Sequence, residues 1–270
     1  MKVNKKYNCL FIGNAIVDVV SEVSFDFLEK QKIEVGSWRP VSINEINELQ
    51  EEMSNTIIAS GGSAANSAVG FSLLGGRSAF IGRVKSDDFG SLYINDLKEA
   101  NVDFISNPVD TGNETGRCLV YVSPDAQRSM RTYLGAASNL SLENLDINAF
   151  ENSEIVYMEG YLWDEPVAKE AYKKAFDLSK KLEIKSALSL SDKFCVEKWR
   201  DEFRNLSENT DIVFGNEEEI MSLYDTNILS NAISAASNEL NLCIITLSLI
   251  HISEPTRPRL ISYAVFCLKK

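Results

Sequence analysis

The sequence predicts an α/β fold built on a mostly parallel sheet, with a small antiparallel β lid beside it. Over most of residues 7–246, apolar runs typical of buried strands alternate with amphipathic segments typical of helices, as a parallel sheet covered by helices requires. The alternation stops once, at 117–134, where two β-rich segments flank a turn at 123–127 and predict a hairpin. Together with an early strand at 17–23, this hairpin predicts a lid with strands at about 15–40 and 115–135.

The elements of the first half follow from local signals. Ser42 and Glu45 form a capping box that opens a helix, and paired glycines punctuate the segments around it. We expect a strand at 7–13, a helix at 43–53, an extended run at 55–60, a helix from 63 to about 74, a strand at 77–82 and a helix that ends near 100.

The second half returns to strict alternation after the hairpin. Its apolar runs have the length of strands, and the segments between them have apolar residues at helical spacing. We expect strands at 154–160, 185–190, 211–215 and 243–246, with helices at 165–182, 196–206, 216–220 onward and about 230–240.

Composition excludes several function classes. The net charge of −12 argues against a surface for nucleic acid or anionic membrane, which needs clustered Lys and Arg. The five cysteines are scattered and His251 is the only histidine. The sequence therefore lacks the clustered Cys and His residues of a zinc site, and it offers a single histidine for a Ser–His or Cys–His nucleophile pair. No apolar run approaches bilayer length and no leader pattern follows Met1, so we expect a cytoplasmic protein without a membrane partner.

The segment from Ser60 to Gly76 has the pattern of a binding site. Gly61 and Gly62 permit positive φ and allow a backbone to approach a bound molecule closely. Ser63 is predicted to cap the small-residue helix that follows, whose free N–H groups make a polar, partly positive surface. This pattern leaves open what the ligand is, a phosphate included.

Two polar residues follow the first strand. Asn14 and Asp18 stand where the carboxyl end of a central strand is expected, which is where open α/β sheets bind ligands. The alternative is a plain turn with Asp18 facing solvent. No GxGxxG follows the strand and no GxxxxGK[ST] occurs, so the sequence predicts neither a dinucleotide fold nor a P-loop.

A third polar group follows the strand at 211–215. Asn216 and Glu219 stand three apart at the expected sheet edge and could hold a hydrated Mg²⁺. Glu217 and Glu218 are better explained as charges that complement the helix dipole. Asp192, after the strand at 185–190, is equally well explained as a strand-end cap or as a ligand contact.

These motifs together resemble the ribokinase-like (PfkB) family of sugar and nucleoside kinases. The resemblance rests on Gly13–Asp18, on the stretch from Gly61-Gly62-Ser63 to Asp87-Asp88-Phe89-Gly90, on the hairpin, and on Asn216-Glu217-Glu218-Glu219, which looks like the family's Asn-x-x-Glu motif. Within the family, the runs 159–164 and 190–195 look most like bacterial adenosine kinase-like members.

The resemblance implies a three-layer α/β/α domain at 1–247 and an ATP- and Mg²⁺-dependent transfer of phosphate to an alcohol. It implies a substrate-binding set at the sugar and the lid, and a second set near the nucleotide and the metal. The substrate-binding set is Asn14, Asp18, Gly61, Gly62, Ser63, Asn66, Arg117 and Asn139; the second set is Asn216, Glu219 and Thr246, with Asn216 and Glu219 as the metal pair.

The family's catalytic aspartate, in a Gly-Ala-Gly-Asp motif, has no match in this sequence. The tail 248–270 also changes character, with four basic residues and one acidic residue and the only histidine. We therefore hypothesise that the domain at 1–247 is incomplete, that 248–270 is an atypical and non-native tail, and that this chain is poorly folded and nearly inactive. A continuous reading frame in an independently sequenced locus would contradict a non-native tail.

Three functions stay open at this stage. The first is phosphorylation of the primary hydroxyl of a ribonucleoside, adenosine above all. The second is a sugar kinase acting on ribose, fructose or a keto-deoxy sugar acid, and the third is a non-catalytic ligand-binding remnant. An aromatic clamp at the pocket would favour the nucleoside, whereas a pocket Arg or Lys would favour an acid. The oligomeric state is open.

Overall fold

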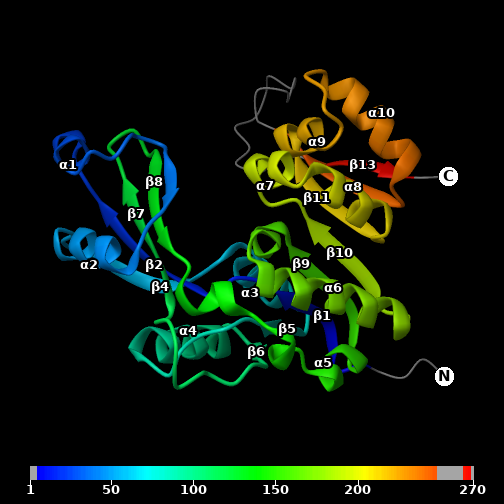
Figure 1. Ribbon diagram of the computed structural model, residues 1–270, viewed down its shortest axis with the longest axis horizontal. Coiled ribbons are helices and arrows are strands. Elements are labelled where there is room, and N and C mark those ends of the chain that lie inside the picture. Colours follow the sequence, from blue (N-terminus) through cyan, green and yellow to red (C-terminus); the bar gives the residue numbers. More distant parts are fainter. Residues whose placement is uncertain (1–4, 248–263, 269–270) are drawn as a thin grey trace.

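The structure is a computed structural model in which residues 5–247 and 264–268 are described (Figure 1). It has a large sheet flanked by helices and a smaller sheet that stands to one side as the lid. Among the described residues no helix is both long and apolar enough to cross a bilayer. The predicted fold class is confirmed, with one correction to the lid.

The large sheet contains seven parallel strands and one antiparallel edge strand. Their order across the sheet places the first strand, β1, near the middle, between β9 and β5. The order is β13 (Ala264–Leu268), β12 (Leu242–Thr246), β11 (Ile212–Asn216), β10 (Lys185–Ser189), β9 (Ser153–Glu159), β1 (Tyr7–Ile12), β5 (Ser78–Ile81) and β6 (Val102–Phe104).

Helices cover both faces of this sheet because its central strands are apolar on both sides. In β1, Cys9 and Phe11 join the core under α3 and α4, whereas Leu10 and Ile12 join the core under α6. The helices of the large domain are α3 (Ser63–Leu73), α4 (Asp88–Glu99), α5 (Ile147–Glu151), α6 (Pro166–Lys181), α7 (Lys193–Lys198), α8 (Arg200–Glu208), α9 (Glu217–Leu223) and α10 (Leu229–Glu239). Three short 3₁₀ turns lie at Gly135–Asn139, Leu142–Asn144 and Gly160–Asp164.

The lid is a mixed sheet, not the antiparallel one that we expected. Its order is β3 (Trp38–Pro40), β8 (Arg128–Tyr133), β7 (Gly116–Val122), β2 (Ile16–Glu22) and β4 (Ile57–Gly61). The hairpin β7–β8 is antiparallel as predicted, but β2 pairs with β7 and β3 with β8 in parallel. The parallel pair β2–β7 arises because both strands enter the lid from the large domain and run in the same direction.

The outer face of the lid is covered by helices of its own. Here α1 (Phe25–Lys30) and α2 (Ile43–Glu51) place Leu28 and Ile46 against Val19, Leu119 and Tyr121 of the sheet. The opposite face is left toward the large domain. The chain crosses between the two parts four times, at 13–15, 61–62, 105–115 and 134–135.

One predicted helix differs from the structure. The predicted helix at 196–206 is two helices, α7 and α8, which meet at Trp199, whose Nε1 donates to Asp164 Oδ1 at 2.9 Å. Asp192 caps α7, because its carboxylate accepts from Phe194 N at 2.7 Å.

Within the tail, the backbone of 264–268 forms β13. The other residues of the tail lie outside the described part, and the non-native origin of the tail stays a hypothesis.

Candidate acceptor site

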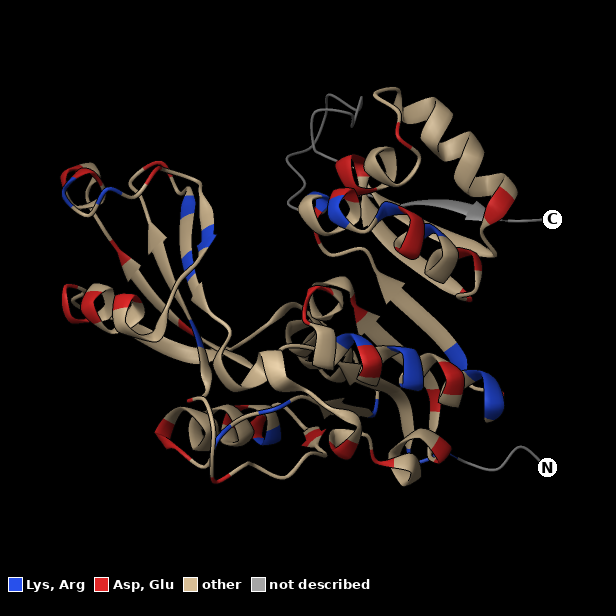
Figure 2. Ribbon diagram, in the orientation of Figure 1, with Lys and Arg blue, Asp and Glu red and all other residues tan. Residues whose placement is uncertain are grey.

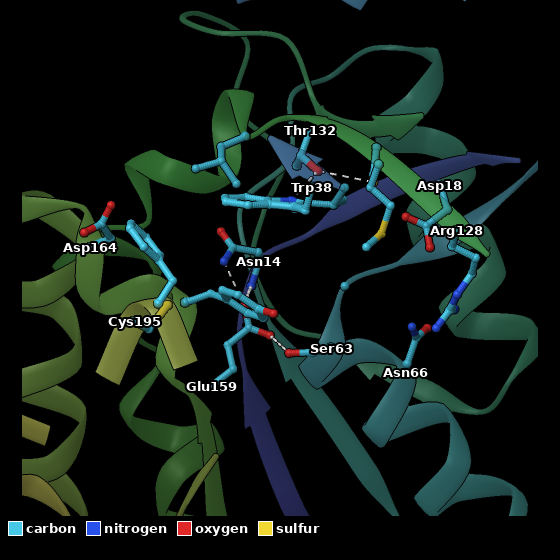
Figure 3. A pocket seen from close by; sticks show the side chains of 17 residues that line it. Asn14, Asp18, Trp38, Ser63, Asn66, Arg128, Thr132, Glu159, Asp164 and Cys195 are labelled. Carbon is cyan, nitrogen blue, oxygen red and sulfur yellow. Dashed lines mark hydrogen bonds between the residues drawn. The ribbon is translucent and has the colours of Figure 1, made fainter. Parts of the chain in front are cut away.

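A cavity of about 300 Å³ lies between the inner face of the lid and the carboxyl ends of β1 and β9 (Figure 3). Lid strands, the start of α3 and the turns that follow β9 and β10 all contribute to its walls. Five of the eight residues predicted to bind the acceptor line it, namely Asn14, Asp18, Gly62, Ser63 and Asn66. Segments that are far apart in the sequence therefore meet around the residues that were predicted to bind the acceptor.

Glu159 organises the floor of this cavity. It is fully buried at the end of β9, and its carboxylate accepts four hydrogen bonds. Asn14 donates its backbone N–H at 2.7 Å and its Nδ2 at 2.8 Å to Oε1, while Ser63 Oγ at 2.6 Å and Ala64 N at 2.9 Å donate to Oε2. Burial raises the pKa of Glu159, and these donors partly offset the rise.

The start of α3 is consequently occupied by the protein's own carboxylate. Ser63 is the first residue of the helix rather than its predicted cap; that position belongs to Gly62, and the Ser63 hydroxyl donates to Glu159. A helix N-terminus attracts one anion, and here Glu159 supplies it. The helix start is thus filled, which argues against a phosphate at this point.

Gly61 and Gly62 are required by two different contacts. Gly62 has φ +93°, and a Cβ there would overlap the carbonyl oxygen of Asn14. A Cβ on Gly61 would overlap the carboxylate of Asp18, which lies across the β2–β4 pair. The glycine pair therefore lets the Asn14 backbone and the Asp18 side chain lie against the β4–α3 junction.

Asp18 faces the cavity without a hydrogen-bond partner among the described residues. It is half-buried on the inner face of β2, and burial raises its pKa to about 6, against a smaller lowering by Arg128. A carboxylate in this state has its oxygens free to accept hydrogen bonds from a ligand. The alternative of a plain solvent-facing turn does not fit this position.

Arg128 is the one basic side chain among the described residues that line the cavity. Figure 2 shows mostly acidic residues on the lid helices α1 and α2, with basic residues on the lid strands. Arg131, three positions further along β8, is buried. Arg128 is exposed, and it lies beside Asp18 and Asn66 in Figure 3.

Aromatic side chains form the other part of the cavity, and the sequence did not place them. Trp38 of β3 and Phe194 of α7 are 45% and 48% exposed, and their ring centroids are 6.5 Å apart across the cavity. Trp38 Nε1 donates to Thr132 Oγ1 at 3.1 Å, which fixes the indole on the lid. Tyr161 also lines the cavity. A planar ring system can therefore stack here.

Arg117 and Asn139 do not line the cavity. Side chains alternate along β7, so Cys118 faces the cavity and Arg117 faces the other side of the lid. Asn139 is exposed beyond the lid, where its carbonyl accepts from Arg83 at 3.0 Å. The geometry therefore gives neither residue a direct contact with a ligand in this cavity.

We expect Arg117→Met to lower stability without lowering ligand affinity. The buried guanidinium donates to Asn47, Gln50 and Glu114 at 2.7, 2.7 and 3.2 Å, and losing these bonds costs about 2 kcal/mol of unfolding free energy. Denaturant unfolding and adenosine calorimetry on the same variant measure the two quantities. A folded variant with weakened binding would show that Arg117 reaches the ligand.

The second predicted set meets at the carboxyl edge of β11 and β12. Asn216 and Thr246 are register partners, and Glu219 lies in the first turn of α9. Asn216 and Glu219 form a reciprocal capping box: Asn216 N and Nδ2 donate to Glu219 at 3.0 and 2.8 Å, and Glu219 N donates to Asn216 Oδ1 at 2.9 Å. Burial raises the pKa of Glu219.

This pair could hold Mg²⁺ through water. Amide and carboxylate oxygens suit the ion, and each Glu219 oxygen accepts only one hydrogen bond from Asn216, so each keeps a lone pair for a water of a hydrated ion. No group of three or more His, Cys, Asp or Glu suited to a metal ion occurs in the described chain. Two side chains with water as the remaining ligands agree with this count.

Comparison with known proteins agrees with this architecture. Residues 33–248 match the family described as pfkB family carbohydrate kinase. The structure of adenosine kinase from Sinorhizobium meliloti is 38% identical, with a TM-score of 0.84 over 90% of this chain and 75% of that one. The structure of a probable sugar kinase from Rhizobium etli CFN 42 is 33% identical, with a TM-score of 0.84 over 90% and 74%.

A curated relative with a similar sequence is named as a fructokinase. Probable fructokinase-6 of Arabidopsis thaliana is 30% identical over 185 residues, which are 63% of this chain and 48% of that protein. The chain thus spans about half the length of this relative. From the family match and the two structures, the chain belongs to the pfkB family of carbohydrate kinases.

Proposed function

We propose that the protein transfers the γ-phosphoryl group of ATP to the primary hydroxyl of a ribonucleoside, with adenosine as the acceptor. The observation that carries this proposal is the pair Trp38 and Phe194, two half-exposed rings in the cavity lining whose planes are tilted by 44° to each other. Exposed aromatic faces provide stacking energy for a base and little for a sugar alone. The likeness to the adenosine kinase of S. meliloti supports the same acceptor.

The polar part of the cavity suits the ribose. Figure 3 shows Asp18 and Asn66 together, with Trp38 between them and Cys195, the neighbour of Phe194. In our proposal the Asp18 carboxylate accepts from the ribose diol, and Asn66 bonds a further hydroxyl. Asn14 donates its backbone N–H and one N–H of its side-chain amide to Glu159, so its side-chain oxygen and second amide N–H are left for the sugar.

The nucleotide side is proposed at the edge formed by Asn216, Glu219 and Thr246. Asn216 and Glu219 would hold a hydrated Mg²⁺, which when bound neutralises charge on the transferring phosphoryl group. The capping box keeps the Glu219 carboxylate fixed at the start of α9. Thr246 would contact the nucleotide from the adjacent strand end.

We further propose that the 270-residue chain binds its acceptor but transfers phosphate slowly. The printed sequence contains no Gly-Ala-Gly-Asp run, so a base from that motif has to come from outside these residues. Absence of a general base costs about 10²–10⁴-fold in rate.

Cys9, Cys118 and Cys195 are buried free thiols, which supports the proposed cytoplasmic location.

A sugar kinase is the second candidate, and Arg128 is the observation that favours it. The exposed guanidinium of Arg128 at the cavity could bind the carboxylate of a keto-deoxy sugar acid, and the curated relative is named a fructokinase. Against this, Asp18 faces the same space and would repel an acid. A binding protein without turnover is the third reading.

We expect Trp38→Ala and Phe194→Ala each to weaken adenosine binding about tenfold, because each removes one stacking face. Ribose binding is expected to change less than twofold, since no base is present to stack. Isothermal calorimetry with adenosine and ribose measures both. Phe25→Ala removes a comparably exposed ring on α1, outside the cavity lining, and serves as the matched control.

Equal losses for adenosine and ribose would contradict the base clamp and favour the sugar kinase. A parallel ATP-dependent phosphorylation assay, run with this chain and with a version carrying a Gly-Ala-Gly-Asp segment from a family member, tests catalysis. Rapid turnover by the 270-residue chain alone would refute the proposed lack of a base. Binding without turnover in either version would support the third reading.

A further inference from the structure

Tyr172 is a buried tyrosine to which no role has been given above. It lies on α6, on the face of the sheet opposite α3, and it is fully buried among the residues under that helix. Figure 1 shows α6 running along β9 and β1. Its hydroxyl is 2.5 Å from the carbonyl oxygen of Glu159 and 3.1 Å from that of Ile12.

These two carbonyls mark the point where β1 and β9 separate. The parallel pairing of the two strands ends at Ile12 and Met158, and Gly13, the residue after β1, donates its N–H to Ile81 of β5 on the other side. One phenol proton shared between the two carbonyls joins the strand ends at the last ladder pair. Burial raises the pKa of Tyr172 well above its ordinary value, so the phenol stays a donor.

The bridged carbonyls stand immediately next to the groups that form the cavity floor. Ile12 precedes Gly13 and Asn14, and the Glu159 carbonyl belongs to the residue whose carboxylate holds Asn14 and α3. Moving β9 relative to β1 would shift Glu159 Oε1 away from the two Asn14 donors. The ring itself is held by Trp163, with centroids 6.5 Å apart.

We propose that Tyr172 is a positioning residue of the acceptor site, which sets the spacing between Asn14 and Glu159 by bridging the ends of β1 and β9. This inference rests on the proposed function in so far as the spacing matters for an acceptor. Tyr172 contacts no ligand and acts only through the strand ends.

The test is Tyr172→Phe in the 270-residue chain, with Tyr121→Phe as the matched control. Tyr121 is equally buried, but its hydroxyl has no hydrogen-bond partner in the described part of the chain. We expect Tyr172→Phe to weaken adenosine binding about tenfold, as loss of one shared buried hydrogen bond would predict. The control should leave the affinity unchanged.

Amide hydrogen exchange provides a readout that needs no ligand. The N–H groups of Asn14 and Ala64 both donate to Glu159, so we expect their exchange to become about tenfold faster in Tyr172→Phe, while amides in β10 and β11 change little. Uniformly faster exchange would show a purely structural hydroxyl and overturn the proposal.

The two readouts separate failure of this inference from failure of the proposed function. If adenosine does not bind the unmodified chain but exchange at Asn14 and Ala64 still responds selectively, the proposed acceptor is wrong and Tyr172 still positions the floor. If adenosine binds equally well to the unmodified chain and to Tyr172→Phe, the positioning role is wrong and the acceptor stands.

Discussion

Asp18→Asn is expected to abolish most acceptor binding while making the protein more stable at neutral pH. Its carboxyl is half-buried, has no hydrogen-bond partner among the described residues, and has its pKa raised by burial to about 6. An ionised group in that position destabilises the folded state, whereas the neutral amide does not. We expect a gain of about 2 kcal/mol in unfolding free energy at pH 7.

The pH window follows from the direction of this shift. Between the ordinary pKa near 4 and the folded value near 6, the folded protein retains a proton that the unfolded chain has released. Asp18 therefore makes the unfolding free energy fall as pH rises through this window. Denaturant unfolding should give equal stabilities for the two proteins near pH 4 and a growing advantage for Asp18→Asn up to about pH 7.

Binding should respond in the opposite sense. The carboxylate accepts two charge-assisted bonds from a diol in our proposal, so its loss should weaken adenosine and ribose alike by about 100-fold. In the unmodified protein the affinity should rise with pH through about 6, as Asp18 ionises. Glu22→Gln, an exposed acid on the same strand, is the control. Unchanged affinity in Asp18→Asn would remove Asp18 from the site.

Glu159→Gln should have the contrary effect on stability, although it is the same kind of substitution in the same cavity. Four donors converge on this carboxylate, two on each oxygen. An amide replaces one accepting oxygen by an N–H group, so two of those donors lose their acceptor inside the protein. We expect the unfolding free energy to fall by about 3 kcal/mol.

Two further variants serve as comparisons for the stability of Glu159→Gln. Glu154→Gln, an exposed acid on the same strand, should leave stability within experimental error. Ser63→Ala removes one of the four donors and should cost less than Glu159→Gln. If Glu159→Gln instead stabilises the protein, as Asp18→Asn is expected to do, then desolvation of the charge outweighs the four hydrogen bonds.

Much of the cavity floor could be read from the sequence because it is made from two short segments. Asn14 and Asp18 lie four residues apart, and Gly62, Ser63 and Asn66 lie within one helical turn, so their spacing already brings each set together. The alternation of strands and helices likewise predicted the parallel sheet.

The remaining features depend on contacts that no local pattern encodes. Trp38 lies in the three-residue strand β3, and it meets Phe194 of α7 only in the folded chain, because the two residues are far apart in the sequence. Glu159 cannot be told from an ordinary strand residue in the sequence, because the four donors that surround its carboxylate come from distant segments. The resemblance implied ligand contacts for Arg117 and Asn139, but Arg117 faces the other side of β7 and Asn139 is exposed beyond the lid.

The four crossings between lid and large domain form a narrow neck of backbone. Gly13, Gly62, Gly116 and Gly135 stand at these crossings, and a Cβ on any of them would overlap a neighbouring backbone or side-chain atom. Chains packed this closely resist being pulled apart, so the lid is expected to turn about the neck as one rigid body. Asn14 and Gly62 are part of that neck. The lid and the acceptor floor therefore share these two residues, and we expect a ligand bound on the floor to affect the angle of the lid as well.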